Sequence, residues 1–426
     1  MGTVLIITYA IKLLGFFKES LIASQFGLSE LIDTYLLAMI LPALIQSVFL
    51  SSFSNVFVPN YVKALKQKED IPSFQTSCVI LTVSIGLVLL VVSFFSFQPF
   101  LETIFPGHEQ NYYELITKQF YFLIACIPFW AVSSLLTGML NIENEFRFST
   151  LSSIFIPLIT IVNIYFFIDF FGETVLAVST LLGTVFSFVY LIIVNFYKKL
   201  LHLGKPDFKN SNFTLMLRQV PYKMSSSLFT SLIPTVDNYF AAKLIVGSIA
   251  AISFGQKIPA FVLGFSMVGL GTVLLPHFSK LVDTDIKRAY LELFKILKYL
   301  LIGSLVIVGI LIIFSPEIVQ LLFERNEFDS EDTMVVARIQ QILLAYVPFY
   351  LCGNVLVKFL TSINKNKFMA QMSTINFIAN GFLDYFLFQE FGVNGIVMST
   401  AIIYSINPFI YYIYTRKQFN LLKSSQ

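Results

Sequence analysis

The sequence predicts an all-α polytopic membrane protein, with about twelve transmembrane helices of roughly 20 residues each in two six-helix pseudo-symmetric halves. Apolar residues make up 56% of the 426 residues and charged residues 12%, whereas a soluble domain carries about 25% charged residues. Apolar runs long enough to cross a bilayer recur along the whole chain, and patterns of the first half return in the second. This composition excludes a soluble enzyme, a secreted disulfide-rich protein and a nucleic-acid-binding protein.

Each predicted span is an apolar run between polar breaks. In the first half the spans are residues 1–24, 31–61, 76–105, 113–140, 149–170 and 174–197. In the second half they are residues 214–245, 249–279, 289–314, 333–361, 368–388 and 393–415. The longest connection on the side opposite to the termini is predicted to be residues 315–333, which is too short for a catalytic domain.

The basic residues of the loops predict the orientation. One alternating set of loops, together with the C-terminal tail, holds most of the Lys and Arg, from Lys63 to Lys423. The other set holds Arg325, with Lys118 and Lys243 near helix ends. Because basic loops remain on the cytoplasmic side, we expect a multi-pass protein of the bacterial inner membrane with both termini in the cytoplasm.

The two halves are related by an internal repeat. The triplet 127–129 (IPF) returns as 347–349 (VPF), and Gly172 and the pair Ser179-Thr180 return as Gly392 and Ser399-Thr400, all 220 residues later. We therefore expect an N-terminal half at residues 1–200, a cytoplasmic linker at 201–213 and a C-terminal half at 214–426. Repeats of this kind are typical of transporters.

Three lysines lie deep within predicted spans: Lys12 and Lys18 in the first and Lys257 in the eighth. A charge at bilayer depth costs about 2.5–3.5 kcal/mol on insertion scales, so it calls for a function or a partner. Glu19 lies seven residues after Lys12 and shares its helix face. The lysines indicate an anionic substrate such as a phosphate or diphosphate. The alternative is that they extend along the helix to the interface.

A second group of polar residues has the chemistry of a cation site. Asn380 and Asp384 are four residues apart and share a helix face, while Asp237 and Thr400 lie midway along two other spans. Carboxylate, amide and hydroxyl oxygens suit a small hard cation. The alternative is four separate hydrogen bonds between helices.

Several segments resemble the MurJ/MviN family of lipid II flippases, which belongs to the superfamily of multidrug, oligosaccharidyl-lipid and polysaccharide exporters. The similar segments are residues 12–19 (KLLGFFKE), 53–59 (FSNVFVP), 271–276 (GTVLLP) and 322–325 (LFER), which are spread over nearly the whole chain. The resemblance implies the V-shaped transporter fold of that superfamily. The chain is similar to a shortened, divergent member, because we expect twelve spans where the family has fourteen.

The resemblance also implies roles for individual residues. A diphosphate-binding cavity, lined by arginines in the family, would involve Lys12, Lys18, Glu19, Asp33 and Lys257. A sodium site would involve Asp237, Asn380, Asp384, Thr400 and the backbone carbonyl of Ile396. This chain departs from the family at Gln46, Ser47 and Gln256, where the family has charged residues.

Together these features predict a flippase, not an enzyme, that moves an undecaprenyl-diphosphate-linked, lipid II-like precursor across the inner membrane by alternating access. We expect no cofactor apart from Na⁺ as a coupling ion. We also expect a monomer in contact with membrane lipid and with cell-envelope synthesis proteins, and no nucleic-acid partner. The alternatives are a flippase for an O-antigen, capsule or exopolysaccharide unit, a membrane glycosyltransferase, and an assembly scaffold.

Overall fold

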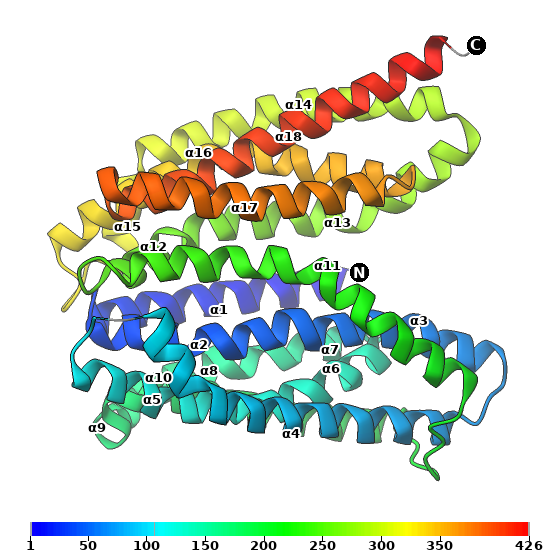
Figure 1. The fold of residues 1–426 in the computed structure, drawn as a ribbon, viewed down its shortest axis with the longest axis horizontal. Helices are drawn as coiled ribbons and strands as arrows, with labels where there is room; N and C mark the ends of the chain where they lie inside the picture. Colours follow the sequence, from blue (N-terminus) through cyan, green and yellow to red (C-terminus); the bar gives the residue numbers. More distant parts are fainter. Residues whose placement is uncertain (1, 106, 425–426) are drawn as a thin grey trace. The chain divides into compact units, whose positions relative to one another are not determined.

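The computed structural model describes residues 2–105 and 107–424, and the regular structure in these ranges is helical (Figure 1). The first helices are α1 (Gly2–Phe26), α2 (Glu30–Ile45), the π-helical turn η1 (Gln46–Leu50), α3 (Ser51–Lys66), α4 (Ile71–Ile104), α5 (Gln110–Ile124) and α6 (Cys126–Ile142). They are followed by α7 (Phe146–Leu151), η2 (Ser152–Ile154), α8 (Phe155–Phe166), α9 (Ile168–Phe171), η3 (Gly172–Thr174) and α10 (Val175–Tyr197). The later helices are α11 (Ser211–Ala241), α12 (Ser248–Gly255), α13 (Lys257–Thr284), α14 (Ile286–Ile313), α15 (Ser315–Phe323), α16 (Ser330–Ser362), α17 (Asn366–Phe391) and α18 (Val393–Ser424).

Each of the twelve predicted spans coincides with one helix or with a stack of consecutive helices, which confirms the predicted fold class. Within the described ranges, nine helical stretches are long and apolar enough to cross a membrane. Three predicted spans fall outside this group: α1, α11 and α17. These same three helices carry most of the predicted site residues.

Contacts between Cα atoms divide the chain into two units. Unit 1 comprises residues 1–22 and 29–235, and unit 2 comprises Ala23–Leu28 and Val236–Gln426. The division therefore falls inside α11. The linker predicted at 201–213 corresponds to a segment without helix at residues 200–210, followed by the start of α11.

The order in which helices pack is the same in both units. In unit 1, α6 packs against α4 and α10, and α10 packs against α8. In unit 2, α16 packs against α14 and α18, and α18 packs against α17. These are corresponding spans of the two repeats, so the sequence repeat is also a repeat of packing.

The same backbone turns end corresponding helices. Asn144 after α6 and Asn364 after α16 both have a left-handed backbone, with φ of 59° and 58°. The following residues, Glu145 and Lys365, donate from their backbone N–H to carbonyls five residues earlier, at 2.9 Å in each case. This is the Schellman arrangement, which a short polar residue such as asparagine tolerates well. The two turns lie 220 residues apart, so this repeat extends to individual dihedral angles.

Close contacts between helices depend on small residues, as is usual inside membranes. A Cβ atom placed on Gly183 of α10 would lie 2.6 Å from the Cα atom of Ile156 on α8. A Cβ atom on Gly353 of α16 would lie 2.9 Å from Cγ of Pro408 on α18. Glycine is therefore required at both crossings.

The last turn of α1 belongs to unit 2, and hydrogen bonds within that unit fix its position. Asn326 Nδ2 donates to Ser24 Oγ at 3.0 Å, and the backbone N–H of Glu327 donates to the Ser24 carbonyl at 3.2 Å. Gly27, with φ of 55°, lies so close to the Glu327 carbonyl that a side chain would collide with it. The turn after α1 is thus fastened to the connection between α15 and α16.

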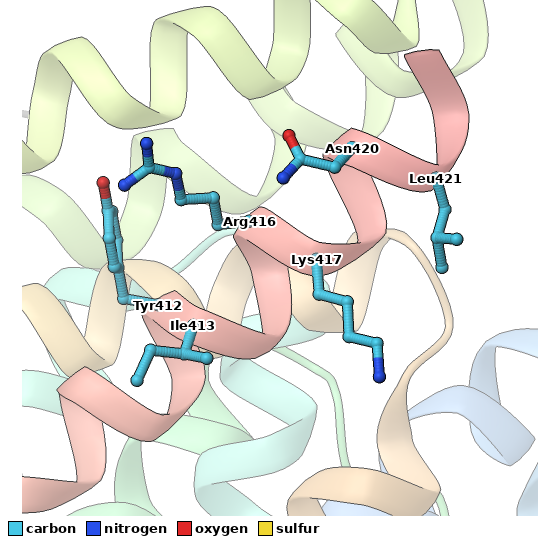
Figure 2. Close-up of a pocket in the computed structure, with 6 residues that line it drawn as sticks. All are labelled: Tyr412, Ile413, Arg416, Lys417, Asn420 and Leu421. Carbon is cyan, nitrogen blue, oxygen red and sulfur yellow. The ribbon is translucent and has the colours of Figure 1, made fainter. Parts of the chain in front are cut away.

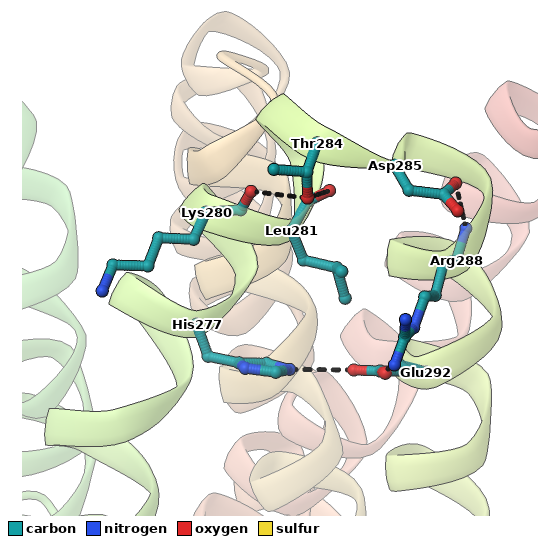
Figure 3. Close-up of polar contacts among 7 residues, drawn as sticks. All are labelled: His277, Lys280, Leu281, Thr284, Asp285, Arg288 and Glu292. Atoms are coloured by element: carbon teal, nitrogen blue, oxygen red, sulfur yellow. Dashed lines mark hydrogen bonds and ion pairs between the residues drawn. The ribbon is translucent and has the colours of Figure 1, made fainter.

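The turn between α13 and α14 is held by polar contacts (Figure 3). Asp285 caps α14 by accepting from the backbone N–H of Arg288 at 3.0 Å. Glu292 lies 2.9 Å from His277 Nε2 and accepts from Arg288 Nε at 3.3 Å. The carboxylate of Glu292 therefore links the end of α13 to the first turns of α14.

Two features of this architecture were not expected from the sequence. The segment 315–333, predicted as a loop, contains α15, whose Val319 and Phe323 are buried. The eighth span is interrupted at Gln256, between α12 and α13 and immediately before Lys257. The hydrophobic pattern of α15 is only nine residues long, which is too short to be recognised as a helix between acidic neighbours.

Candidate substrate and cation sites

The polar cluster of unit 2 is built from three helices. Asp237 lies near the end of α11, Asn380 and Asp384 lie one turn apart on α17, and Ile396, Ser399 and Thr400 lie in the first turns of α18. Asp237 is 6% exposed, while Asn380 and Asp384 are completely buried. The structure therefore brings together the five residues predicted for the sodium site.

Hydrogen bonds fix the positions of the side chains in this cluster. Thr400 Oγ1 donates to Asp237 Oδ2 at 3.0 Å, and Asn380 Nδ2 donates to Ser399 Oγ at 3.1 Å. The Ser399 hydroxyl can donate either to Asp384 Oδ1 or to the Ile396 carbonyl, which lies 2.9 Å away. The two carboxyl groups also lie close enough to interact with each other.

Three oxygens of the cluster have no hydrogen-bond donor among the described residues: Asp237 Oδ1, Asn380 Oδ1 and Asp384 Oδ2. A buried acceptor without a partner is costly, and two neighbouring carboxylates add repulsion. A monovalent cation or a proton would relieve both costs. The donor set, with carboxylate, amide, hydroxyl and carbonyl oxygens, has the hardness that an alkali or alkaline-earth cation prefers.

Unit 1 contains an ion pair in its first helix. Lys18 Nζ lies 2.6 Å from Glu19 Oε1, and the two side chains are 21% and 19% exposed. Tyr35 of α2 interacts electrostatically with Lys18, and its hydroxyl lies 2.9 Å from Thr180 Oγ1 on α10. The ion pair with Glu19 reduces the free-energy cost of burying the Lys18 ammonium group. It uses one of the three N–H donors of Lys18 and leaves two for other acceptors.

The other predicted cavity residues of unit 1 are placed separately. Lys12 is half-buried on α1, and among the described residues it has no hydrogen-bond or ion-pair partner. Asp33 is 2% exposed on α2. Beside it, Thr34 Oγ1 accepts from Gln119 Nε2 of α5 at 2.8 Å, which joins α2 to α5.

In unit 2, Lys257 is half-buried at the first residue of α13, where the chain has just turned after Gln256. The start of a helix carries a partial positive charge. A second positive charge there strengthens an environment for anions. Lys257 has an interaction within the described structure.

The positions at which the chain departs from the family pattern also have a structural context. Gln46 is exposed, and it begins the π-helical turn η1, in which Ser47 donates to the Leu44 carbonyl at 3.1 Å. Single π-helical turns are common at functional sites. Gln256 is exposed at the break between α12 and α13.

Sequence reasoning did not assign Ser399, Tyr35 or Thr180 to a site. Ser399 is completely buried between Asn380 and Asp384. The return of Ser179-Thr180 as Ser399-Thr400 could have identified these residues. Two hydroxyl groups that recur at the same place in two apolar helices indicate buried hydrogen bonds.

Comparison with known proteins gives the family. The family profile described as "Lipid II flippase MurJ" matches residues 22–426. The chain belongs to the lipid II flippase MurJ family. A "Probable lipid II flippase MurJ" of Buchnera aphidicola subsp. Schizaphis graminum is 26% identical over 417 residues, which cover 96% of this chain and 81% of the relative. The corresponding protein of Rickettsia prowazekii is 24% identical and covers 97% and 83%.

Solved structures support the MurJ fold. A structure titled "Lipid II flippase MurJ, inward closed conformation" superposes with a TM-score of 0.84 at 23% identity, over 98% of this chain and 88% of the other. An inward-facing transporter of the multidrug MATE family superposes with a TM-score of 0.78 at 13% identity, over 99% of both chains. This MurJ family member is therefore a multi-pass membrane protein with the predicted transporter fold.

Proposed function

We propose that this protein is a flippase that moves lipid II, an undecaprenyl-diphosphate-linked precursor of peptidoglycan, across the membrane by alternating access. Membership of the MurJ family supports this proposal most strongly. The half-buried Lys18–Glu19 pair on α1 supports it independently, since a cation inside a membrane span indicates an anionic substrate.

The lysines would hold the diphosphate as point charges. Phosphate oxygens would take the free donors of Lys18 and compete with Glu19 for the third. Lys12 and Lys257 are the other two lysines that would bind the diphosphate. Moving each net negative charge outward from a negative interior releases about 2.3 kcal/mol per 100 mV, so the membrane potential favours export.

We also propose that the unit 2 cluster holds Na⁺. Asp237, Asn380, Asp384 and Thr400 would bind it through their side chains, and Ile396 through its carbonyl, because three of their oxygens are buried without donors. Na⁺ would supply the coupling to an ion gradient when bound. The cluster itself holds its carboxylates in fixed positions through Ser399 and Thr400.

A second candidate substrate is a lipid-linked O-antigen, capsule or exopolysaccharide unit. Gln46 favours it, because this exposed residue of η1 is uncharged where the family has an arginine. One fewer cation weakens the hold on a diphosphate and leaves recognition more dependent on the sugar. We further propose a monomer with both termini in the cytoplasm, consistent with the basic loops, and contacts with cell-envelope synthesis proteins.

Complementation of a conditional lipid II flippase mutant tests the proposal. Wild type should restore growth, Lys18→Ala should not, and Lys66→Ala, which removes an exposed charge at the end of α3, should behave as wild type. Rescue by Lys18→Ala would refute the role of Lys18. Failure of the wild type despite membrane insertion would instead favour the polysaccharide substrate, to be assayed with the corresponding lipid-linked glycan.

A further inference from the structure

The end of α18 carries a row of basic and polar residues that neither proposed site uses. Tyr411, Thr415 and Phe419 of this helix are buried, and the Phe419 ring stacks on Tyr290 with centroids 5.0 Å apart. These residues fix the inner face of the helix. Ile413, Arg416, Lys417, Asn420 and Leu421 lie on the exposed side of this helix, and Tyr412 is half-buried beside them.

The outward residues form an open groove with a volume of about 560 Å³. It is lined by Tyr412, Ile413, Arg416, Lys417, Asn420 and Leu421. Figure 2 shows two rows along the helix: Tyr412, Arg416 and Asn420 on one side, and Ile413, Lys417 and Leu421 on the other. In the first row the cation lies one helical turn from polar uncharged side chains, and in the second it lies one turn from apolar side chains.

Among the described residues, no acidic side chain neutralises the two cations. Arg416 and Lys417 are exposed, and within the described ranges neither has an ion-pair or hydrogen-bond partner. The described residues that line the groove include no acidic one. Ile413 and Leu421 in the same groove are 67% and 54% exposed, so apolar and cationic surfaces are offered together.

A neighbouring groove extends this surface. It has a volume of about 620 Å³, shares Leu421 with the first groove, and is lined by Lys365 and Gln418 together with Tyr290 and other apolar residues. Lys365 belongs to the left-handed turn after α16. A third cation therefore lies beside the same end of α18, and the part of this lining that the structure describes contains no acidic residue.

We propose that this end of α18 is a binding site for an anionic phospholipid of the cytoplasmic leaflet. Arg416 and Lys417 would bind the phosphate, Asn420 and the Tyr412 hydroxyl would bind head-group oxygens, and an acyl chain would lie along Ile413 and Leu421. Charge complementarity supports this occupant: unneutralised cations next to exposed apolar side chains fit a phosphate attached to a hydrocarbon chain. The loop charges predict that this end of the helix is cytoplasmic, where anionic lipids attract basic residues.

Native mass spectrometry of the full chain with added phosphatidylglycerol tests the site. Replacing both cations, Arg416→Ala with Lys417→Ala, should weaken phosphatidylglycerol binding about 30-fold, because each cation near a membrane surface contributes roughly a factor of five. The matched control is Lys66→Ala with Lys68→Ala, which removes two exposed charges that do not line the groove, and it should bind as wild type. The charge-preserving variant Arg416→Lys with Lys417→Arg should keep most of the binding.

Other ligands distinguish the sources of the phosphate group. Phosphatidylcholine, which is zwitterionic, should bind weakly to all variants, and millimolar inorganic phosphate should not displace phosphatidylglycerol. Equal loss of phosphatidylglycerol in the control variant would overturn the proposal, as would displacement by inorganic phosphate. Undecaprenyl diphosphate that binds at Arg416 and Lys417 more tightly than phosphatidylglycerol would also overturn it, since the groove would then be an entry site for the substrate.

Discussion

Each unit contains an asparagine that donates a hydrogen bond to a serine, followed by a threonine that is hydrogen-bonded to another helix; we call these three residues the frame of the unit. The residues around the frame differ between the units. In unit 1, Asn163 Nδ2 donates to Ser179 Oγ at 3.0 Å, and in unit 2, Asn380 Nδ2 donates to Ser399 Oγ at 3.1 Å. The adjacent threonine is bonded to Tyr35 in unit 1 and to Asp237 in unit 2.

The difference lies in charge and in unused oxygens. The frame of unit 2 and the residues around it include two carboxylates and three buried oxygens without donors, whereas none of the donorless oxygens within the described ranges belongs to the frame of unit 1. In unit 1 the nearby charges are Lys18 and Glu19, which neutralise each other. The repeat thus preserves the packing of the helices, while the charged residues beside the hydrogen-bonded side chains differ between the two units.

The largest effect should follow from removing a carboxylate of unit 2. Asp237→Asn should abolish stabilisation by Na⁺, which in the wild type should reach about 2.7 kcal/mol when Na⁺ is at 100 times its dissociation constant. Thermal unfolding in NaCl against choline chloride measures this. Asn163→Ala in the frame of unit 1 is the control and should keep the full response to Na⁺. A response in Asp237→Asn equal to that of the wild type would exclude this cluster as the Na⁺ site.

Replacement of glycine by alanine should destabilise the protein to different extents at the two close helix crossings. Gly183→Ala should destabilise the protein by about 1–3 kcal/mol, because the new Cβ would lie 2.6 Å from a backbone atom of Ile156. Gly353→Ala should cost less, since its Cβ would meet the ring of Pro408 at 2.9 Å. Unfolding of both variants in mixed micelles gives the comparison. The reverse order would mean that α8 shifts more easily than the Pro408 ring.

The repeated threonines allow a matched pair of substitutions. Thr400→Ala removes a proposed Na⁺ ligand together with its hydrogen bond to Asp237, and should lower Na⁺ affinity by about 10-fold or more. Thr180→Ala, at the corresponding position of unit 1, should leave Na⁺ affinity unchanged. Calorimetric titration with Na⁺ measures both, and equal losses would show that the effect is not specific to the cation cluster.

The smallest effect should come from the turns after α6 and α16. The pKa of Glu145 lies below its ordinary value, because Lys198 Nζ donates a hydrogen bond to its carboxylate at 2.5 Å and adds a favourable charge. A lowered folded-state pKa stabilises the protein above the unfolded value of about 4.3 and ceases to do so as the pH falls through the folded value. Unfolding between pH 7 and pH 3 should show a small difference between wild type and Glu145→Gln that disappears at the acidic end. Lys365→Gln, at the corresponding position, is the control and should show no such convergence.

Much of the fold could be predicted from the sequence, because apolar runs and basic loops depend on the bilayer itself. The residues of the unit 2 cluster could be predicted in part, since Asn380 and Asp384 share a helix face, whereas Ile396 followed only from the resemblance to the family. The bond of Ser399 to both Asn380 and Asp384 could not, because a hydroxyl within an apolar helix can equally bond its own backbone. The π-helical turn at Gln46 was likewise hidden, since it changes hydrogen bonding without changing the apolar pattern.

The hydrogen bond between Asn326 and Ser24 has a consequence for biosynthesis. The two residues are 302 positions apart, and chains are synthesised at about 5–20 residues per second, so the first helix waits on the order of 15 to 60 s for its last partner. During that interval its end, with two lysines and a glutamate upstream, must remain in the membrane without the segment that will hold it.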